Sequence, residues 1–166
     1  MIFVTVGTHE QPFDRLLKYI DQMIEKGIIK EEVVVQKGYT DYEPQNYKAK
    51  KLISYDEMRL NIENARIVVT HGGPASFIAP LSMGKIPIVV PRKKEFNEHV
   101  NNHQLDFSRE VEKRMKNIIV VENEDEMFEA ILNYDEKVKK MNKVNFSNNE
   151  KFCLEITNIV NNLFDK

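Results

Sequence analysis

Short runs of consecutive apolar residues recur along the chain, separated by segments in which apolar residues stand three or four positions apart. A strand buried on both faces reads as such a run, whereas a half-buried strand alternates apolar and polar positions. Spacings of three and four are typical of helices with one apolar face. The pattern predicts six strands, at about 2–6, 32–36, 52–53, 67–69, 86–90 and 117–121. It predicts helices between them, at about 13–26, 57–65, 74–83, 98–115 and 124–133.

The regular alternation of strands and helices indicates the fold class. Parallel strands need a crossover connection, usually a helix, so this alternation predicts a parallel sheet covered by helices on both faces. We expect an α/β fold of three layers with a doubly wound sheet of about six strands, similar to a Rossmann fold. At 166 residues the chain is long enough for one domain with a full core, which we place at residues 1–135.

The composition changes after the last helix of that domain. Residues 134–150 are polar and charged, and their lysines favour a solvated helix and loop over a lipid-facing patch. In residues 151–164, one apolar face is predicted from positions that repeat at helical spacing. We expect residues 136–166 to form a helical extension that packs on its own domain or docks on a partner. The apolar positions are Phe152, Ile156, Ile159, Val160 and Leu163.

Composition argues against several classes of protein. Apolar residues make up 42% of the chain and charged residues 30%, which is ordinary for a soluble globular protein. The net charge of -2 and the lack of a basic stripe argue against a nucleic-acid partner. The single cysteine, Cys153, excludes an internal disulfide, and no apolar run approaches the roughly 20 residues needed to span a bilayer. We expect a cytoplasmic protein that does not cross a membrane by itself.

The strongest local signal lies where the fourth predicted strand meets the next helix. The strand ends at Thr70-His71, the chain turns on Gly72-Gly73, and Pro74 stands at the first helical position, where its missing N–H costs no hydrogen bond. A glycine pair before a helix leaves backbone N–H groups exposed, with the positive end of the helix dipole behind them. Ser76 adds a hydroxyl beside these amides. The combination suits a phosphate or diphosphate, so we interpret residues 66–104 as one half of a nucleotide-sugar site.

Ligands of open parallel sheets bind at the carboxyl ends of the strands. Three loops have that location, at residues 7–10, 36–38 and 71–76. The nucleophile elbow of serine hydrolases, the dinucleotide-binding glycine motif and the P-loop are all missing from the sequence, which disfavours those three chemistries. His99 and His103 could share one helix face as zinc ligands do, but no third ligand is evident in the sequence. We therefore expect no metal site.

Taken as a set, these motifs resemble a known family. The stretch from His71 to Lys85, followed by Asn102-His103-Gln104, is similar to the C-terminal, donor-binding half of GT-B glycosyltransferases of family 28. The resemblance extends over nearly the whole chain. It is closest to the small soluble subunit of two-part transferases, such as the pair that adds the second GlcNAc of the dolichol-linked oligosaccharide. Residues 7–11 and 96–99 resemble the bacterial pairs that build capsular and exopolysaccharide repeat units.

The resemblance implies a UDP-sugar as the donor substrate and no separate cofactor. The backbone at positions 72, 73 and 75, together with Ser76, would hold the diphosphate. The segment around residues 91–92 would border the uracil, and residues 103–104 would approach the sugar hydroxyls. Many family members bind the ribose with a glutamate in the helix after the glycine loop, where this chain has Ala79. Its ribose contacts must therefore differ. The implied substrate-binding residues are Gly7, Thr8, His71, Gly72, Gly73, Pro74, Ala75, Ser76, Pro91, Arg92, Asn97, Glu98, His103 and Gln104.

A GT-B enzyme has two Rossmann-like halves, and the resemblance implies that this chain supplies one. We expect a membrane-anchored partner subunit that binds a lipid-linked saccharide acceptor, and an inverting, metal-independent transfer at the inner face of the cell membrane. His9 is our candidate general base, while the alternatives are that it shapes its loop, that it meets the partner, or that the base belongs to the other subunit. The alternatives to a donor-binding subunit are a non-catalytic scaffold for a membrane glycosyltransferase and a free-standing sugar-nucleotide enzyme.

Overall fold

The computed structural model describes residues 1–141 and 149–164. Its six strands form one sheet with parallel neighbours in the order β3-β2-β1-β4-β5-β6, which confirms the predicted doubly wound α/β fold. The strands are β1 (Ile2–Thr5), β2 (Val33–Gln36), β3 (Ala49–Lys50), β4 (Ile67–His71), β5 (Ile88–Val90) and β6 (Ile119–Val120). The helices are α1 (Asp14–Glu25), α2 (Tyr55–Asn64), α3 (Pro74–Ser82), the 3-10 helix η1 (Lys94–Phe96), α4 (His103–Met115), α5 (Glu124–Leu132), α6 (Tyr134–Lys139) and α7 (Asn149–Phe164).

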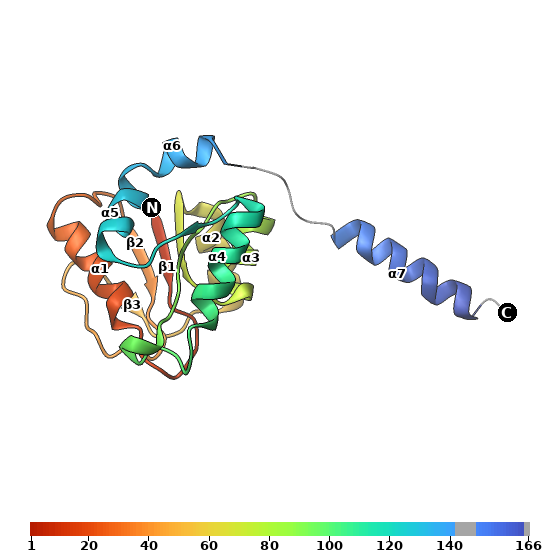
Figure 1. Ribbon diagram of the computed structural model, residues 1–166, viewed down its shortest axis with the longest axis horizontal. Helices are drawn as coiled ribbons and strands as arrows, with labels where there is room; N and C mark the ends of the chain where they lie inside the picture. Colours follow the sequence, from red (N-terminus) through yellow and green to blue (C-terminus); the bar gives the residue numbers. More distant parts are fainter. Residues whose placement is uncertain (142–148, 165–166) are drawn as a thin grey trace.

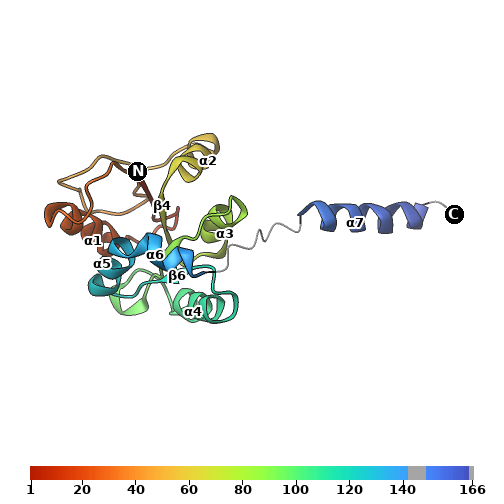
Figure 2. The ribbon, with the colours of Figure 1, turned by 90° about the horizontal axis from the view of Figure 1, so that it is seen from above.

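Helices cover both faces of the sheet. α1 and α5 lie on one face, and α2, α3 and α4 lie on the other (Figures 1 and 2). Because side chains alternate along a strand, Val4 of β1 packs in the core cluster that contains Leu16 of α1, whereas Phe3 packs with Ile62 of α2. The central strands are thus buried on both sides, and for this reason they read as continuous apolar runs in the sequence.

The order of the strands creates a crevice at the carboxyl edge of the sheet. β1 pairs with β2 on one side and with β4 on the other. The chain leaves β1 toward α1 on one face and leaves β4 toward α3 on the opposite face, so the two loops diverge and open a space between them. On the α2–α3 face, this edge of the sheet is polar, since Thr5 is in register with Gln36 of β2 and with Thr70 of β4.

Several predicted boundaries are wrong. The third strand lies at Ala49–Lys50 rather than at 52–53, and α2 begins at Tyr55 rather than at 57, because the Ser54 hydroxyl accepts the Glu57 N–H in a reciprocal capping box. The helix predicted from residue 98 begins at His103, since Asn97 adopts a left-handed conformation (φ 56°) that interrupts it. Val100 lies before this helix and is 69% exposed.

The C-terminal extension consists of two parts with different surroundings. Tyr134 is buried in the core, and Val138 and Met141 pack against it, so α6 belongs to the domain. α7 lies apart from the domain (Figure 1), and its side chains from residue 150 to 164 are all exposed, including the predicted apolar face. The rest of the extension, residues 142–148 and 165–166, lies outside the described residues. Docking of α7 on a partner stays a prediction.

Candidate functional site

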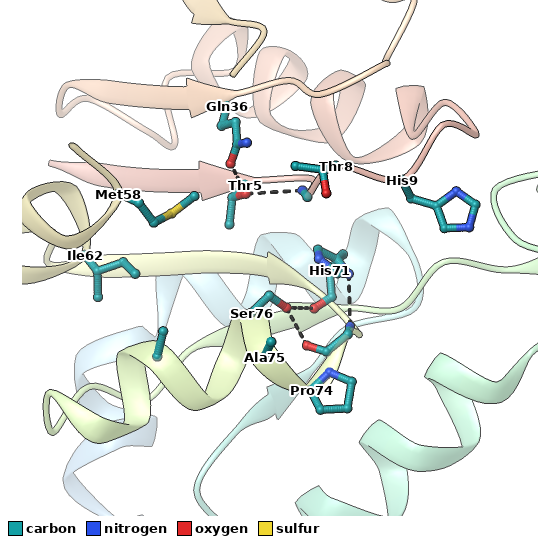
Figure 3. Close-up of a pocket in the computed structure, with 13 residues that line it drawn as sticks. Thr5, Thr8, His9, Gln36, Met58, Ile62, His71, Pro74, Ala75 and Ser76 are labelled. Atoms are coloured by element: carbon teal, nitrogen blue, oxygen red, sulfur yellow. Dashed lines mark hydrogen bonds between the residues drawn. The ribbon is translucent and has the colours of Figure 1, made fainter. Parts of the chain in front are cut away.

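A pocket of about 560 Å³ opens in the crevice between the ends of β1 and β4 (Figure 3). It is bounded by the turn after β1, by the start of α3 and by one side of α2. Met58 and Ile62 lie at one end of the view and His9 at the other, with His71 and Ser76 between them. The complete lining is Thr5, Gly7, Thr8, His9, Gln36, Met58, Ile62, His71, Gly73, Pro74, Ala75, Ser76 and Ala79.

The glycine loop forms the predicted helix start, but its amides are used differently from the prediction. α3 begins at Pro74 after the N-cap Gly73. The Gly72 N–H donates to the Gln104 side-chain oxygen (3.1 Å), and the Gly73 N–H donates to His71 Nδ1 (3.0 Å). Both amides, which we expected to point outward, are therefore bound inside the protein. The Ala75 N–H has no acceptor among the described residues, so it is the amide that the first turn of α3 leaves for an anion.

The two glycines at positions 7 and 73 are required by the His71 ring. A Cβ on Gly7 would lie 2.5 Å from His71 Nε2, and a Cβ on Gly73 would lie 2.4 Å from His71 Cε1. Both distances are shorter than any van der Waals contact. The imidazole is thus held between two stretches of bare backbone, which links the loop after β1 to the loop after β4.

His71 is a neutral hydrogen-bond donor at physiological pH. Burial lowers the pKa of His71 to about 4, and the nearby Arg92 cation contributes to the decrease. Because Nδ1 accepts the Gly73 N–H, the single proton of the neutral ring lies on Nε2. His71 lines the pocket and therefore offers it an N–H donor without a positive charge.

His9 has the same local arrangement, which bears on its predicted role as a general base. Its Nδ1 accepts the Gln11 N–H (3.1 Å), so the neutral ring carries its proton on Nε2. Burial lowers the pKa of His9, with smaller contributions from Arg92 and from His99, whose ring centroid is 5.2 Å away. A base must present a free lone pair to the proton that it accepts. The geometry therefore favours His9 as a donor or loop-shaping residue over His9 as the base.

Arg92 is buried behind the pocket and does not line it. The side chain is 1% exposed, and its guanidinium donates to the backbone oxygens of Val6 (2.9 Å), Gln11 (2.7 Å) and Glu98 (3.1 Å). Burial lowers the pKa of Arg92 to about 10, at which the group is still charged at neutral pH. Arg92 thus fixes the loop after β1 to the loop after β5, and Pro91, also buried, lies outside the pocket.

The remaining residues predicted from the loop after β5 also lie outside the pocket. Glu98 is buried in an ion pair with Arg15 (2.9 Å), and the Gln104 side chain accepts the backbone N–H groups of Gly72 and Arg92. Asn97 and His103 are exposed to solvent. The structure therefore brings together the predicted residues of positions 7–9, 71 and 73–76 in the pocket, whereas Gly72 lies outside the lining. It uses Arg92, Glu98 and Gln104 as a framework.

Sequence reasoning missed part of the pocket. Thr5, Met58 and Ile62 were not among the predicted site residues, and Gln36 was noted only as part of a loop at the carboxyl edge. The polar residues that end the apolar runs 2–6 and 32–36 carried a usable signal, because a polar residue at the carboxyl end of a buried strand faces the ligand edge. Met58 and Ile62 carried no such signal, since they read as the apolar face of a helix.

The described residues do not supply a metal centre or a membrane-spanning helix. Within residues 1–141 and 149–164, no group of three or more His, Cys, Asp or Glu side chains is arranged to hold a metal ion. No helix in the same ranges is long and apolar enough to cross a bilayer.

Comparison with known proteins gives a family match and a fold match. The model of the family described as "Glycosyltransferase family 28 C-terminal domain" matches residues 1–161. The crystal structure of the glycosyltransferase SnogD from Streptomyces nogalater has a TM-score of 0.52 at 18% identity, with 84% of this chain and 39% of that one covered. The glycotransferase of kitacinnamycin has a TM-score of 0.52 at 14% identity, with 83% and 37% covered. The chain thus spans about two fifths of either structure. None of the curated proteins compared with it matches.

Proposed function

This chain belongs to the glycosyltransferase family 28 C-terminal domain family, and from that premise we propose that its pocket binds the UDP part of a UDP-sugar. The chain would be the donor-binding subunit of an inverting hexosyl or N-acetylhexosaminyl transferase. The observation that carries this proposal is the position of the pocket at the switch point of the sheet, with the first turn of α3 at its wall.

The chemical gradient along the pocket matches the parts of such a donor. Met58, Ile62 and Ala79 offer an apolar surface suited to a flat base, and the start of α3 offers the Ala75 N–H and the positive end of a helix dipole for the diphosphate. The sugar would then lie toward His9. This arrangement moves the base away from Pro91 and Arg92, where the resemblance had suggested it.

The transfer step needs stabilisation of the leaving group and a base. The acceptor hydroxyl oxygen bonds to the anomeric carbon while the bond from that carbon to the diphosphate oxygen breaks, and UDP leaves with the electron pair. The Ala75 N–H, the His71 Nε2–H and the α3 dipole are placed to stabilise the negative charge that grows on the diphosphate. The hydroxyl proton passes to a base, which we assign to the other subunit because His9 Nδ1 already accepts the Gln11 N–H.

The second half of the enzyme is proposed from the resemblance to two-part transferases. The chain spans 39% and 37% of the two similar glycosyltransferase structures. We infer that a membrane-anchored subunit supplies an acceptor-binding Rossmann half, that the acceptor is a polyprenyl-diphosphate-linked saccharide, and that the product enters a capsular or exopolysaccharide at the inner face of the cell membrane. The exposed apolar face of α7 is the candidate contact with that subunit.

A non-catalytic scaffold is the second candidate function, and α7 is the observation that favours it. A helix whose apolar side chains are all exposed would serve a scaffold as well as it serves a subunit of an enzyme. The two functions differ in the pocket, because a scaffold has no need to bind a nucleotide.

Thermal unfolding with and without UDP distinguishes these functions. At a UDP concentration 100 times its Kd, binding stabilises the folded state by about 2.7 kcal/mol, which raises the Tm by about 5–10 °C for a domain of this size. Gly73→Asp should abolish the shift, since its side chain would collide with His71 and bring a negative charge to the diphosphate. Ser82→Asp adds the same charge at the far, exposed end of α3 and should keep the shift. If UDP does not change the Tm of wild type while the partner subunit still co-purifies, the result would support the scaffold function.

A further inference from the structure

The polar side chains that line the pocket are uncharged at neutral pH. Its lining contains no Asp, Glu, Lys or Arg side chain. The Ser76 hydroxyl already donates to the backbone oxygens of His71 (2.8 Å) and Gly73 (2.6 Å). The Ala75 N–H and the His71 Nε2–H lie along the part assigned to the diphosphate. The side-chain amide of Gln36 lies away from it and has no role in the function proposed above.

A chain of hydrogen bonds fixes the orientation of the Gln36 amide. The Gly7 N–H donates to Thr5 Oγ1 (3.2 Å), and the Thr5 hydroxyl donates to Gln36 Oε1 (2.7 Å). The amide oxygen is therefore turned toward Thr5 and the nitrogen away from it (Figure 3). Gln36 Nε2 donates to no acceptor among the described residues, although the side chain is 3% exposed and lines the pocket. Since the nitrogen is not among the buried side-chain atoms that lack a partner, it is accessible at the pocket wall, where a ligand atom can accept its hydrogen bond.

The position of Gln36 identifies the part of the ligand that it meets. Gln36 ends β2, next to β1, on the face of the sheet that α2 covers, and Figure 3 shows it above Thr5 and on the side of Met58 and Thr8, away from Ser76 and Pro74. This is the side of the pocket opposite the start of α3, so Gln36 meets a part of the nucleotide other than the diphosphate. An amide nitrogen has two N–H donors and no acceptor, and the groups of a base that it matches are ring carbonyl oxygens.

We propose that Gln36, held in the donating orientation by Thr5, reads the ring carbonyl of uracil that cytosine replaces with an amino group, and so selects uracil over cytosine. The proposal rests on the function proposed above. Uracil presents two carbonyl oxygens, whereas cytosine replaces one of them with an amino group, whose N–H donors would face those of Gln36. Such a site discriminates in two ways. It forms a hydrogen bond with uracil that cytosine cannot form, and with cytosine it would leave two sets of N–H groups facing each other without an acceptor.

The test is the ratio of the affinities for UDP and CDP, measured by calorimetry on the full chain, with inorganic diphosphate as a third ligand. Wild type should prefer UDP by about 10-fold or more. Gln36→Met removes the donors at similar size and should bring the ratio close to one, with an unchanged affinity for diphosphate. Gln36→Glu keeps the acceptor for the Thr5 hydroxyl but presents oxygens to the base, so the ratio should shift toward CDP. Both nucleotides carry the same diphosphate, so the added charge cancels in the ratio.

Two variants of Thr5 serve as matched controls for the orientation of the amide. Thr5→Ser keeps the hydroxyl and should keep the preference for UDP. Thr5→Val removes it, which lets the amide rotate, and should lower the preference. An unchanged ratio in both Gln36 variants would overturn the inference alone. A wild-type chain that binds neither nucleotide and no diphosphate would overturn the proposed function and the inference with it.

Discussion

At the scale of single residues, the site depends on groups that fix the protonation of other groups. His71 is the central residue, because its ring packs between Gly7 and Gly73 and its Nδ1 accepts the Gly73 N–H. Arg92 lies behind the site as a buried cation on backbone oxygens and helps to lower the pKa values of both His71 and His9. If the proposed function holds, the pocket binds anions with neutral N–H donors and a helix dipole in place of lysines or arginines.

The pKa of His71 predicts a pH dependence of stability. The unfolded chain binds a proton at this residue below its usual pKa of 6.5, whereas the folded protein binds one only near pH 4. Stability is therefore fully present above pH 6.5 and falls as the pH drops from 6.5 to 4, by up to about 3 kcal/mol.

Urea denaturation of wild type and His71→Gln at pH 7.0, 5.5 and 4.5 measures this effect. The free energy of unfolding of wild type should decrease more steeply than that of the variant, because the variant has no proton to take up at position 71. The carboxylates of both proteins titrate alike, so they cancel in the difference. Parallel pH profiles would show that the folded and unfolded states protonate His71 equally.

At this scale the sequence predicted the loops that line the pocket, but it did not predict the hydrogen-bond partners of several of their residues. A glycine pair before Pro74 predicts a helix start, and the structure has one. The hydrogen-bond acceptors of the Gly72 and Gly73 amides could not be predicted from the sequence. Gln104 comes from a distant part of the chain, and the position of the His71 ring depends on how two loops pack around it. Arg92 likewise has no sequence signal for burial, since its acceptors are backbone oxygens of unrelated segments.

At the scale of elements, α7 differs from every other α-helix that the structure describes. The α-helices of the domain each bury at least one residue, while residues 150–164 of α7 are exposed throughout. Short isolated helices are marginal in water, and tertiary packing normally supplies their stability. An apolar face that is left uncovered indicates a helix completed by another surface.

This difference predicts opposite results for substitutions in two helices. Ile156→Asp and Ile159→Asp together should leave the urea midpoint of the domain unchanged, because neither side chain contributes to its core. Ile20→Ala in α1, at a fully buried position of the core, should cost about 2–5 kcal/mol. A large loss of domain stability in the α7 double variant would contradict the separation of α7 from the domain.

The pattern of apolar positions was most reliable for the central elements and least reliable at the edges. β1, β4 and β5 are buried on both faces and form apolar runs that no helix would produce. β3 has only two residues at the edge of the sheet, and its position was missed because Leu52 is half exposed and lies outside it. The start of α4 was missed because the left-handed Asn97 and the Arg15–Glu98 ion pair shape residues 97–102.

At the scale of the whole molecule, one ligand edge is formed by elements that are distant in sequence. The order β3-β2-β1-β4-β5-β6 brings the residues after β1 and β4 together, with Gln36 of β2 beside them. A second cavity of about 420 Å³ lies near α1 and η1, where Arg15 and Lys18 line it. Three acidic residues, Asp14, Glu98 and Glu124, also line it and offset these cations, which makes it a poorer site for a nucleotide than the crevice between β1 and β4.

A crystal structure of the protein with UDP tests the central claim most directly. We predict a diphosphate oxygen within hydrogen-bond distance of the Ala75 N–H at the start of α3, and the base against Met58 and Ile62 with a carbonyl oxygen on Gln36. UDP bound in the cavity beside Arg15 and Lys18, or at the amino edge of the sheet with the crevice between β1 and β4 left empty, would contradict it.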